Sequence, residues 1–156
     1  MRARVHLDGD QLIATRHLDA EPALVWEAFT TPAHLAAFWG GNHATVEADA
    51  VTVELRIGGR FQIETRGVDG SPRRLSFTYE VIDPPTRLVF TEPQTGLLTE
   101  IRLESNGNGT TVTVHQRRLP AELRTEQARL GLSGILDQLD GLIAELTRQR
   151  PQTNRR

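Results

Sequence analysis

Turn-forming residues divide the stretch from residue 45 to residue 117 into short segments, and this division constrains the fold more than any other feature. The turn clusters are Gly58-Gly59, Asp69-Gly70, Asp83-Pro84-Pro85, Pro93 to Gly96 and Asn106 to Gly109. Between them apolar and polar residues alternate, as in Leu75, Phe77, Tyr79 and Val81. The pattern predicts about six antiparallel strands in a meander with one apolar face and one wet face.

Two short helices are expected before this meander. A strand-like segment, "LIATRHLDA" (12–20), leads into "PALVWEAFT" (22–30), where proline suits the first helical turn. Thr31 and Pro32 interrupt the helix, and Leu35, Phe38 and Trp39 then share one face of a second helical turn. Gly40 and Gly41 end it.

A long amphipathic helix is predicted from about residue 121 to residue 148. Its apolar stripe consists of Leu132, Ile135, Leu136, Leu139, Leu142, Ile143 and Leu146. Gly131, Gly134 and Gly141 each weaken such a helix by up to about 1 kcal/mol relative to alanine. Packing against the sheet must therefore hold it in place.

These elements can bury their apolar faces together only if the sheet curls around the last helix, with the two short helices plugging one end. The expected fold is α+β, with a curled antiparallel sheet of about 6–7 strands. We assign residues 12–148 to one domain, residues 1–11 to a polar leader and residues 149–156 to a disordered basic tail. Such a curl tends to leave a hollow between sheet and helix.

Composition excludes several classes of function. The net charge is −2 and no basic run is present, which argues against a nucleic-acid binder. The chain has no cysteine and no lysine, so thiolate chemistry, lysine Schiff bases and P-loop lysines are excluded. The sequence shows neither a signal-peptide h-region nor an apolar run of membrane-spanning length, so we expect a cytoplasmic protein without a membrane span.

Five stretches together resemble a known family. They are "AEPALVWEAFTTPAHLAAFWGG" (20–41), "IGGRF" (57–61), "VDGS" (68–71), "DPPTRLVFT" (83–91) and "GTTVTVHQ" (109–116). In this order the chain resembles the SRPBCC or START-like (Bet v 1-like) superfamily, most closely the bacterial homologues of the activator of the 90-kDa heat-shock protein ATPase. The resemblance implies the helix-grip fold with a hydrophobic cavity between the sheet and the C-terminal helix.

The resemblance and the strand pattern together suggest which residues bind a ligand in that cavity. The candidates are Trp39, Phe61, Ile63, Phe77, Tyr79, Leu132, Leu136, His34 and His115. Relatives often carry a Gly-Trp pair at the start of the last helix, where this chain has Gly131-Leu132. The smaller side chain is expected to enlarge or reshape the mouth of the pocket.

Each polar candidate for ligand binding also fits a simpler structural role. Tyr79 could orient an apolar ligand with its hydroxyl group, or it could be plain core packing. His34 fits a packing role better than ligand binding. His17, His43 and His115 lie on separate segments without metal-ligand spacing, so neither a metal nor another cofactor is expected.

The arginines are first assigned to the sheet surface, with Arg87 expected to pair with an acidic neighbour. Arg60, Arg66, Arg87 and Arg102 would anchor a ligand carboxylate only if the pleat turned one of them inward.

Three functions remain open from the sequence. The leading one is binding of a hydrophobic or aromatic small molecule, lipid or polyketide-like, by a monomer or homodimer. The resemblance also implies a chaperone-associated interaction protein. Cyclase or hydrolase chemistry in the same cavity is the third, with Tyr79, His34 or His115 as acid–base groups, although no catalytic motif is visible.

Overall fold

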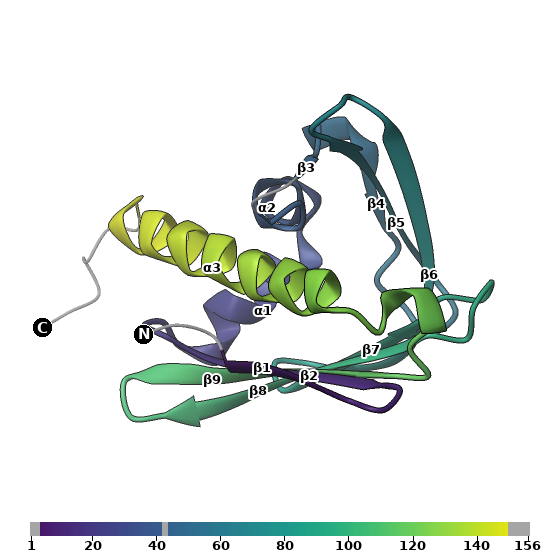
Figure 1. The fold of residues 1–156 in the computed structure, drawn as a ribbon. Coiled ribbons are helices and arrows are strands. Elements are labelled where there is room, and N and C mark those ends of the chain that lie inside the picture. The colour runs from purple at the N-terminus through teal and green to yellow at the C-terminus, as the bar shows by residue number, and fades with distance from the viewer. Residues whose placement is uncertain (1–3, 42–43, 150–156) are drawn as a thin grey trace, which may run out of the picture.

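The computed structural model describes residues 4–41 and 44–149, which form one curled antiparallel sheet gripping a long C-terminal helix (Figure 1). The strands are β1 (Arg4–Asp8), β2 (Gln11–Leu18), β3 (Ala44–Thr45), β4 (Val51–Val53), β5 (Arg60–Gly67), β6 (Pro72–Asp83), β7 (Arg87–Thr91), β8 (Leu98–Asn106) and β9 (Gly109–Arg117). The helices are α1 (Pro22–Thr30), α2 (Pro32–Phe38) and α3 (Glu126–Gln149), with short 3₁₀ turns η1 (Ala48–Ala50) and η2 (Ala121–Leu123). The α+β helix-grip architecture expected from the sequence is confirmed.

The sheet follows the order β1-β2-β9-β8-β7-β6-β5-β3, and β4 also pairs with β5. Its central part is the meander that the turn signals predicted, because each strand from β5 to β8 pairs with the strand that follows it in the chain. β2 pairs antiparallel with β9, so the N-terminal strands are joined to the last strand of the meander.

Two parts of the sheet differ from the sequence-based expectation. Residues Arg4–Asp8, assigned above to a polar leader, form the edge strand β1 and pair with β2. Val5 is buried there although its neighbours are exposed, a single alternation too short to stand out in the sequence. The beginning of the expected meander, residues 44–57, is divided into β3, η1 and β4, so the sheet has nine strands in the described residues where about 6–7 were expected.

The helices cover the concave side of the sheet. α1 packs against β8 and β9, and α3 crosses above it, as Figure 1 shows. Gly40 and Gly41 let α2 turn sharply towards β3: a Cβ on Gly40 would lie 2.3 Å from the carbonyl oxygen of Ala44, and Gly41 has a φ of +62°. None of the helices in the described residues is long and apolar enough to cross a membrane.

Candidate ligand-binding site

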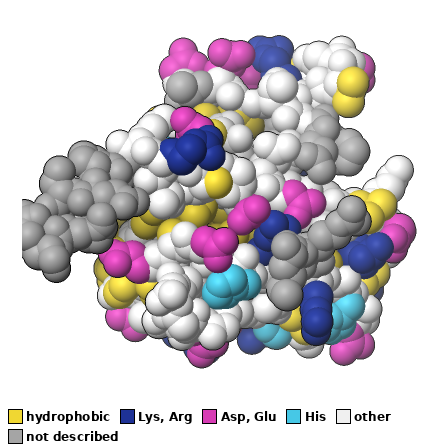
Figure 2. Space-filling view, turned by 90° about the vertical axis from the view of Figure 1, so that its left-hand side faces the viewer, with side chains coloured by type: hydrophobic (Ala, Val, Ile, Leu, Met, Phe, Trp, Pro, Cys, Tyr) yellow, Lys and Arg dark blue, Asp and Glu magenta, His cyan; other side chains and the backbone are white. Residues whose placement is uncertain are grey.

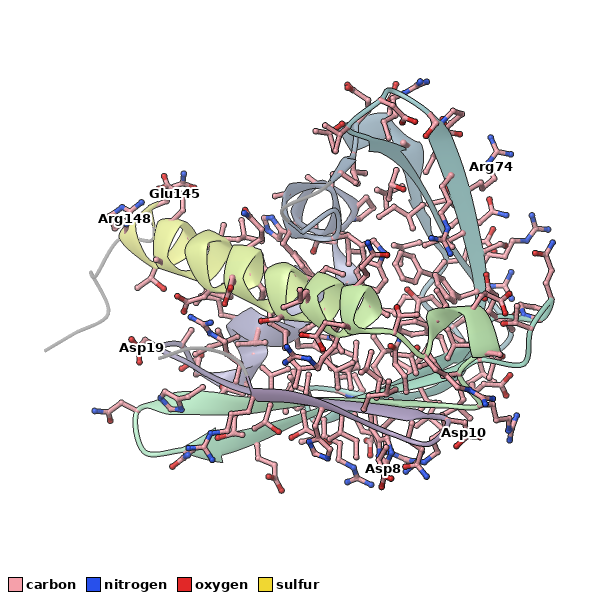
Figure 3. The ribbon with its side chains drawn as sticks, in the orientation of Figure 1. Asp8, Asp10, Asp19, Arg74, Glu145 and Arg148 are labelled. Carbon is pink, nitrogen blue, oxygen red and sulfur yellow. The ribbon has the colours of Figure 1, made fainter. Side chains whose placement is uncertain are left out.

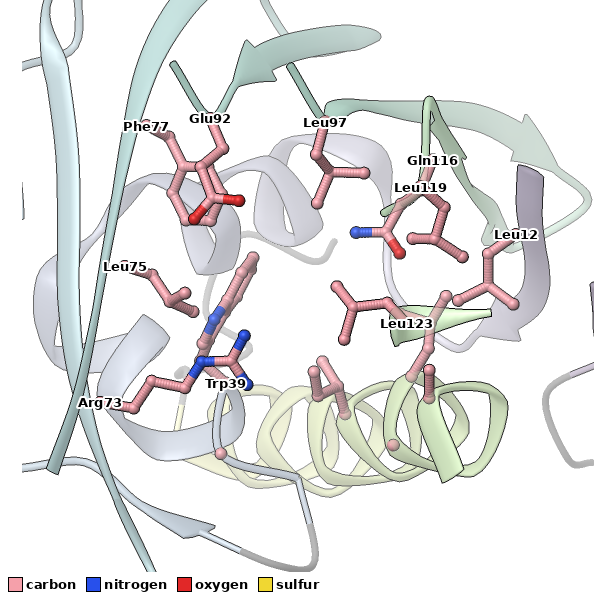
Figure 4. Close-up of a pocket in the computed structure, with 15 residues that line it drawn as sticks. Leu12, Trp39, Arg73, Leu75, Phe77, Glu92, Leu97, Gln116, Leu119 and Leu123 are labelled. Atoms are coloured by element: carbon pink, nitrogen blue, oxygen red, sulfur yellow. The ribbon is translucent and has the colours of Figure 1, made fainter. Parts of the chain in front are cut away.

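A cavity of about 260 Å³ lies between the sheet and the first turns of α3 (Figure 4). It is lined by Leu12, Trp39, Gly40, Arg73, Leu75, Phe77, Glu92, Leu97, Gln116, Leu119, Leu123, Ala128, Gly131, Leu132 and Ile135. These residues come from β2, the turn that follows α2, β6, the β7–β8 connection, the end of β9 and the segment after it, η2 and α3. The lining is mostly aliphatic and aromatic, which is typical of pockets for small apolar ligands.

The hollow arises because β5 and β6 rise away from the rest of the sheet beyond the N-terminal end of α3 (Figure 1). Small residues of α3 face the resulting space. A Cβ built on Gly131 would meet no atom within 4 Å, so the missing side chain adds directly to the open volume. The Gly131-Leu132 pair noted in the sequence therefore lies on the cavity wall.

Aromatic rings form the wall opposite α3. Trp39 packs edge-on against Phe61, with ring centroids 5.2 Å apart, and Phe61 stacks on Phe77 at 5.3 Å. Phe90 packs edge-on against both phenylalanines. This network fixes the two rings that reach the cavity, Trp39 and Phe77, so the wall is already in place before any ligand arrives.

Three polar side chains reach the cavity from different walls. Gln116 donates from Nε2 to Thr99 Oγ1 at 3.3 Å, and Glu92 accepts at Oε1 from Thr95 Oγ1 at 2.8 Å. Arg73 is exposed and has neither a hydrogen-bond nor an ion-pair partner among the described residues. An apolar hollow with a few polar groups at its border suits an amphipathic molecule.

The nine candidate binding residues fall into three groups. Trp39, Phe77 and Leu132 line the cavity. Phe61, Ile63, Tyr79 and Leu136 are buried in the adjoining core and are not part of its lining. His34 and His115 belong to neither the core nor the lining.

Tyr79 lies behind the aromatic wall. Its ring stacks on Phe61 at a centroid distance of 6.2 Å, and it is only 1% exposed. The hydroxyl has no hydrogen-bond partner among the described residues, and burial raises its pKa. A neutral phenol inside a ring cluster is a packing group first, since it has no base beside it to accept a proton.

The two histidines face other surroundings. His34 Nε2 lies 3.7 Å from Glu27 Oε2, which joins α2 to α1. His115 is on the convex face of the sheet, where its Nε2 lies 2.6 Å from Gln11 Oε1. Burial lowers the pKa of His115, the charge of Arg117 lowers it further, and Glu100 opposes both.

His17 and His43 were considered above as metal ligands, and their spacing argued against a metal site. His17 is on β2, with Nε2 3.6 Å from Asp19, while His43 lies outside the described residues. Within residues 4–41 and 44–149 no three metal-ligating side chains come together. The tail assigned to residues 149–156 also lies outside the description, apart from Gln149, which ends α3.

Several cavity residues were missed in the sequence, and one was within reach of the strand pattern. Arg73 precedes Leu75 and Phe77 by two and four positions on β6, so the pleat turns it to the same concave face. Glu92, Leu97, Leu119 and Leu123 come from connecting segments, whose approach to the cavity depends on the curl of the whole sheet.

The face of the molecule shown in Figure 2 carries no large patch of acidic or of basic side chains alone. Acidic and basic side chains are interspersed there, and hydrophobic side chains form only small groups. This agrees with the small net charge of −2 and gives no support to a nucleic-acid interface on that side.

Solved structures share this fold. A crystal structure of a Rhodobacter sphaeroides protein superposes with a TM-score of 0.79 at 23% identity, covering 92% of this chain and 99% of that one. The solution structure of an AHSA1-like protein from Aeromonas hydrophila gives 0.76 at 23% identity, covering 91% and 97%. No curated protein matches the sequence. The family model of the activator of Hsp90 ATPase homolog 1-like proteins matches residues 19–144, and the chain belongs to this family.

Proposed function

We propose that the protein binds a compact hydrophobic or aromatic small molecule, lipid or polyketide-like, in the cavity between the sheet and α3. The observation that carries the proposal is the hollow itself: about 260 Å³ with a mostly apolar lining. Ligand pockets usually measure about 300–1,000 Å³. The hollow is just below this range, so a single-ring aromatic or a medium-length acyl chain fits better than a sterol.

Binding is favoured over catalysis by the placement of the acid–base candidates. Tyr79, His34 and His115 do not line the cavity, so a bound molecule would not touch them without rearrangement. General acid–base catalysis requires a group within hydrogen-bond reach of the reacting atom. The cavity supplies shape and apolar surface, with polar groups only from Arg73, Glu92 and Gln116.

The first test is thermal unfolding of the purified protein with a panel of small apolar acids, alcohols and aromatic metabolites. A ligand at about 100 times its dissociation constant adds about 2.7 kcal/mol to the free energy of unfolding. For a chain of this size the midpoint then rises by about 5–10 °C. A cooperative transition that no compound in the panel moves would contradict the proposal.

A pair of glycine variants shows whether a hit occupies the cavity. Gly131→Leu places a side chain in the hollow, and Gly141→Leu places the same side chain on α3 outside it; neither Cβ has an atom within 4 Å. Both variants remove a helical glycine, so both should gain slightly in intrinsic stability. We expect only Gly131→Leu to lose the ligand-induced shift; loss in both or in neither would place the ligand elsewhere.

The family description favours a second candidate, a chaperone-associated role, because it names an activator of the Hsp90 ATPase. This hypothesis predicts a complex with an Hsp90-type ATPase and a change in its ATP turnover. Turnover measured with and without an excess of this protein tests it, and an unchanged rate without complex formation would exclude it.

A further inference from the structure

Arg73 differs from its neighbours on the β5–β6 hairpin. Arg74 and Arg66 both lie near Glu64, at 3.3 and 3.6 Å, and Arg74 points away from the molecule (Figure 3). Arg73 faces the concave side, lines the cavity and has no carboxylate within ion-pair distance among the described residues. Its charge is therefore available at the border of an apolar hollow.

The other residues of the cavity lining restrict the kind of ligand that the charge of Arg73 could bind. Figure 4 shows Arg73 and Glu92 extending into the opening from different segments, β6 and the β7–β8 connection. No ion pair joins them among the described residues, and Glu92 instead accepts a hydrogen bond from Thr95. The other lining side chains are mostly apolar and include Leu75, Phe77 and Trp39.

From this arrangement we propose that the ligand is an apolar carboxylic acid whose ionised head binds Arg73 while its body fills the cavity. The inference rests on the proposed function and specifies its ligand class. A guanidinium group offers a planar fork of N–H donors that matches a carboxylate in two parallel hydrogen bonds. The carboxylate stays at the exposed rim, so it keeps part of its hydration and avoids the cost of full burial.

The position of Gln116 adds a second element of recognition. Its side chain comes from β9, on the other side of the cavity from Arg73, and its amide nitrogen is engaged with Thr99. The amide oxygen can accept one hydrogen bond from a hydroxyl group on the ligand body. Hydroxylated acids then bind more tightly than their plain counterparts.

The test compares ligands that differ only in the head group. Octanoic acid, octanol and octylamine form one series; cinnamic acid, cinnamyl alcohol and cinnamylamine form the other. At neutral pH these heads are anionic, neutral and cationic. In isothermal titration calorimetry we expect each acid to bind about tenfold more tightly than its alcohol, with the amine weakest.

Three charge variants assign the preference to the rim. Arg73→Gln should weaken acid binding about tenfold and leave alcohol binding within about twofold. Glu92→Gln should tighten acid binding about threefold, because it removes a like charge. Arg74→Gln, on the opposite face of the same strand, is the matched control and should change neither.

The outcomes separate this inference from the proposed function. Equal affinity for acid and alcohol in the unmodified protein, or an equal loss of both in Arg73→Gln, overturns the acid preference while leaving a binding cavity. Failure of every member of both series to bind counts against the cavity as a binding site for compact amphiphiles and so against both proposals. Unfolding midpoints of the variants verify that each is folded.

Discussion

At the scale of single residues, the most unusual group is Glu100, a carboxylate on the convex face that is only 3% exposed. Arg87 Nε lies 2.6 Å from its Oε2, Arg102 Nε lies 2.9 Å from the same oxygen, and Arg117 Nη1 lies 3.3 Å from Oε1. The acidic partner expected for Arg87 is thus found across the β7–β8 pair. The three arginine side chains remain substantially exposed, whereas the carboxylate that binds all of them is buried beneath them.

Replacing Glu100 by glutamine tests this arrangement. Burial alone would raise the pKa of Glu100, but the Arg87 hydrogen bond and the three positive charges outweigh it and hold the pKa below its ordinary value. We expect Glu100→Gln to lose about 2 kcal/mol of unfolding free energy at neutral pH, because three clustered cations lose their common counter-charge. Urea unfolding measures the loss.

The pH dependence follows from the direction of that shift. A lowered pKa in the folded state means that the unfolded chain takes up the proton first, so the contribution of Glu100 is complete above its ordinary value of 4.5. It is lost as the pH falls further, through the folded-state pKa. The difference between wild type and Glu100→Gln should therefore shrink below about pH 4.5; a constant difference down to about pH 3 would show that packing, not charge, is responsible.

At the scale of elements, Arg16 fastens α3 to the sheet. Its side chain points to the concave side of β2 and is 8% exposed, and it pairs with Asp137 and with Asp140, the latter at 3.0 Å. Both aspartates are about two-fifths exposed. These two ion pairs join α3 to β2 on the C-terminal side of the cavity-lining residues of α3. They therefore help to hold those first turns of the helix in position.

This asymmetric burial predicts asymmetric mutants. Arg16→Met removes the buried charge and leaves two hydrated aspartates, so we expect a change of less than about 1 kcal/mol. The double variant Asp137→Asn and Asp140→Asn leaves the arginine buried without a counter-charge and should cost about 3 kcal/mol. Chemical denaturation of both variants measures the order, and a larger loss in Arg16→Met would mean that the ion pair itself is strongly stabilising.

At the scale of the whole molecule, the sequence predicted the elements better than the positions of their charges. Turn clusters and periodicity are local signals, and they located α1, α2, α3 and the meander β5–β9. Arg16 pairs with residues of α3, and Glu100 pairs with residues of β7, β8 and β9; no local pattern specifies these pairings between elements. Alternation of polar and apolar residues predicts that both lie on strands, but it does not predict that their charged side chains are buried.

The candidate site divides in the same way. Trp39, Phe77 and Leu132 were identified because they lie on apolar faces of predictable elements. Tyr79 and Phe61 lie on the same faces but one layer behind, since the depth of a residue depends on how strongly the sheet curls. The curl also decides which connecting residues, such as Glu92 and Leu123, reach the opening.

The strand missed at the N-terminus provides a test of the whole sheet. β1 covers the edge of β2 over five paired positions, and Arg129 of α3 donates to the carbonyl oxygen of Val5 at 3.2 Å. Deleting residues 1–8 removes this cover together with the buried side chain of Val5. We expect a loss of about 3 kcal/mol, hence a fall of about 6–12 °C in the unfolding midpoint.

The uncovered β2 edge should also make the truncated protein self-associate, because unpaired backbone groups along a strand favour pairing with a second copy. Light scattering after size-exclusion chromatography measures this association. His6→Glu is the matched control, since His6 points outward from β1 and its replacement leaves the edge covered. If the deletion leaves a monomer with an unchanged midpoint, β1 is an appendage and the folded unit begins at β2; if it destabilises the chain while His6→Glu does not, β1 is an integral strand of the grip.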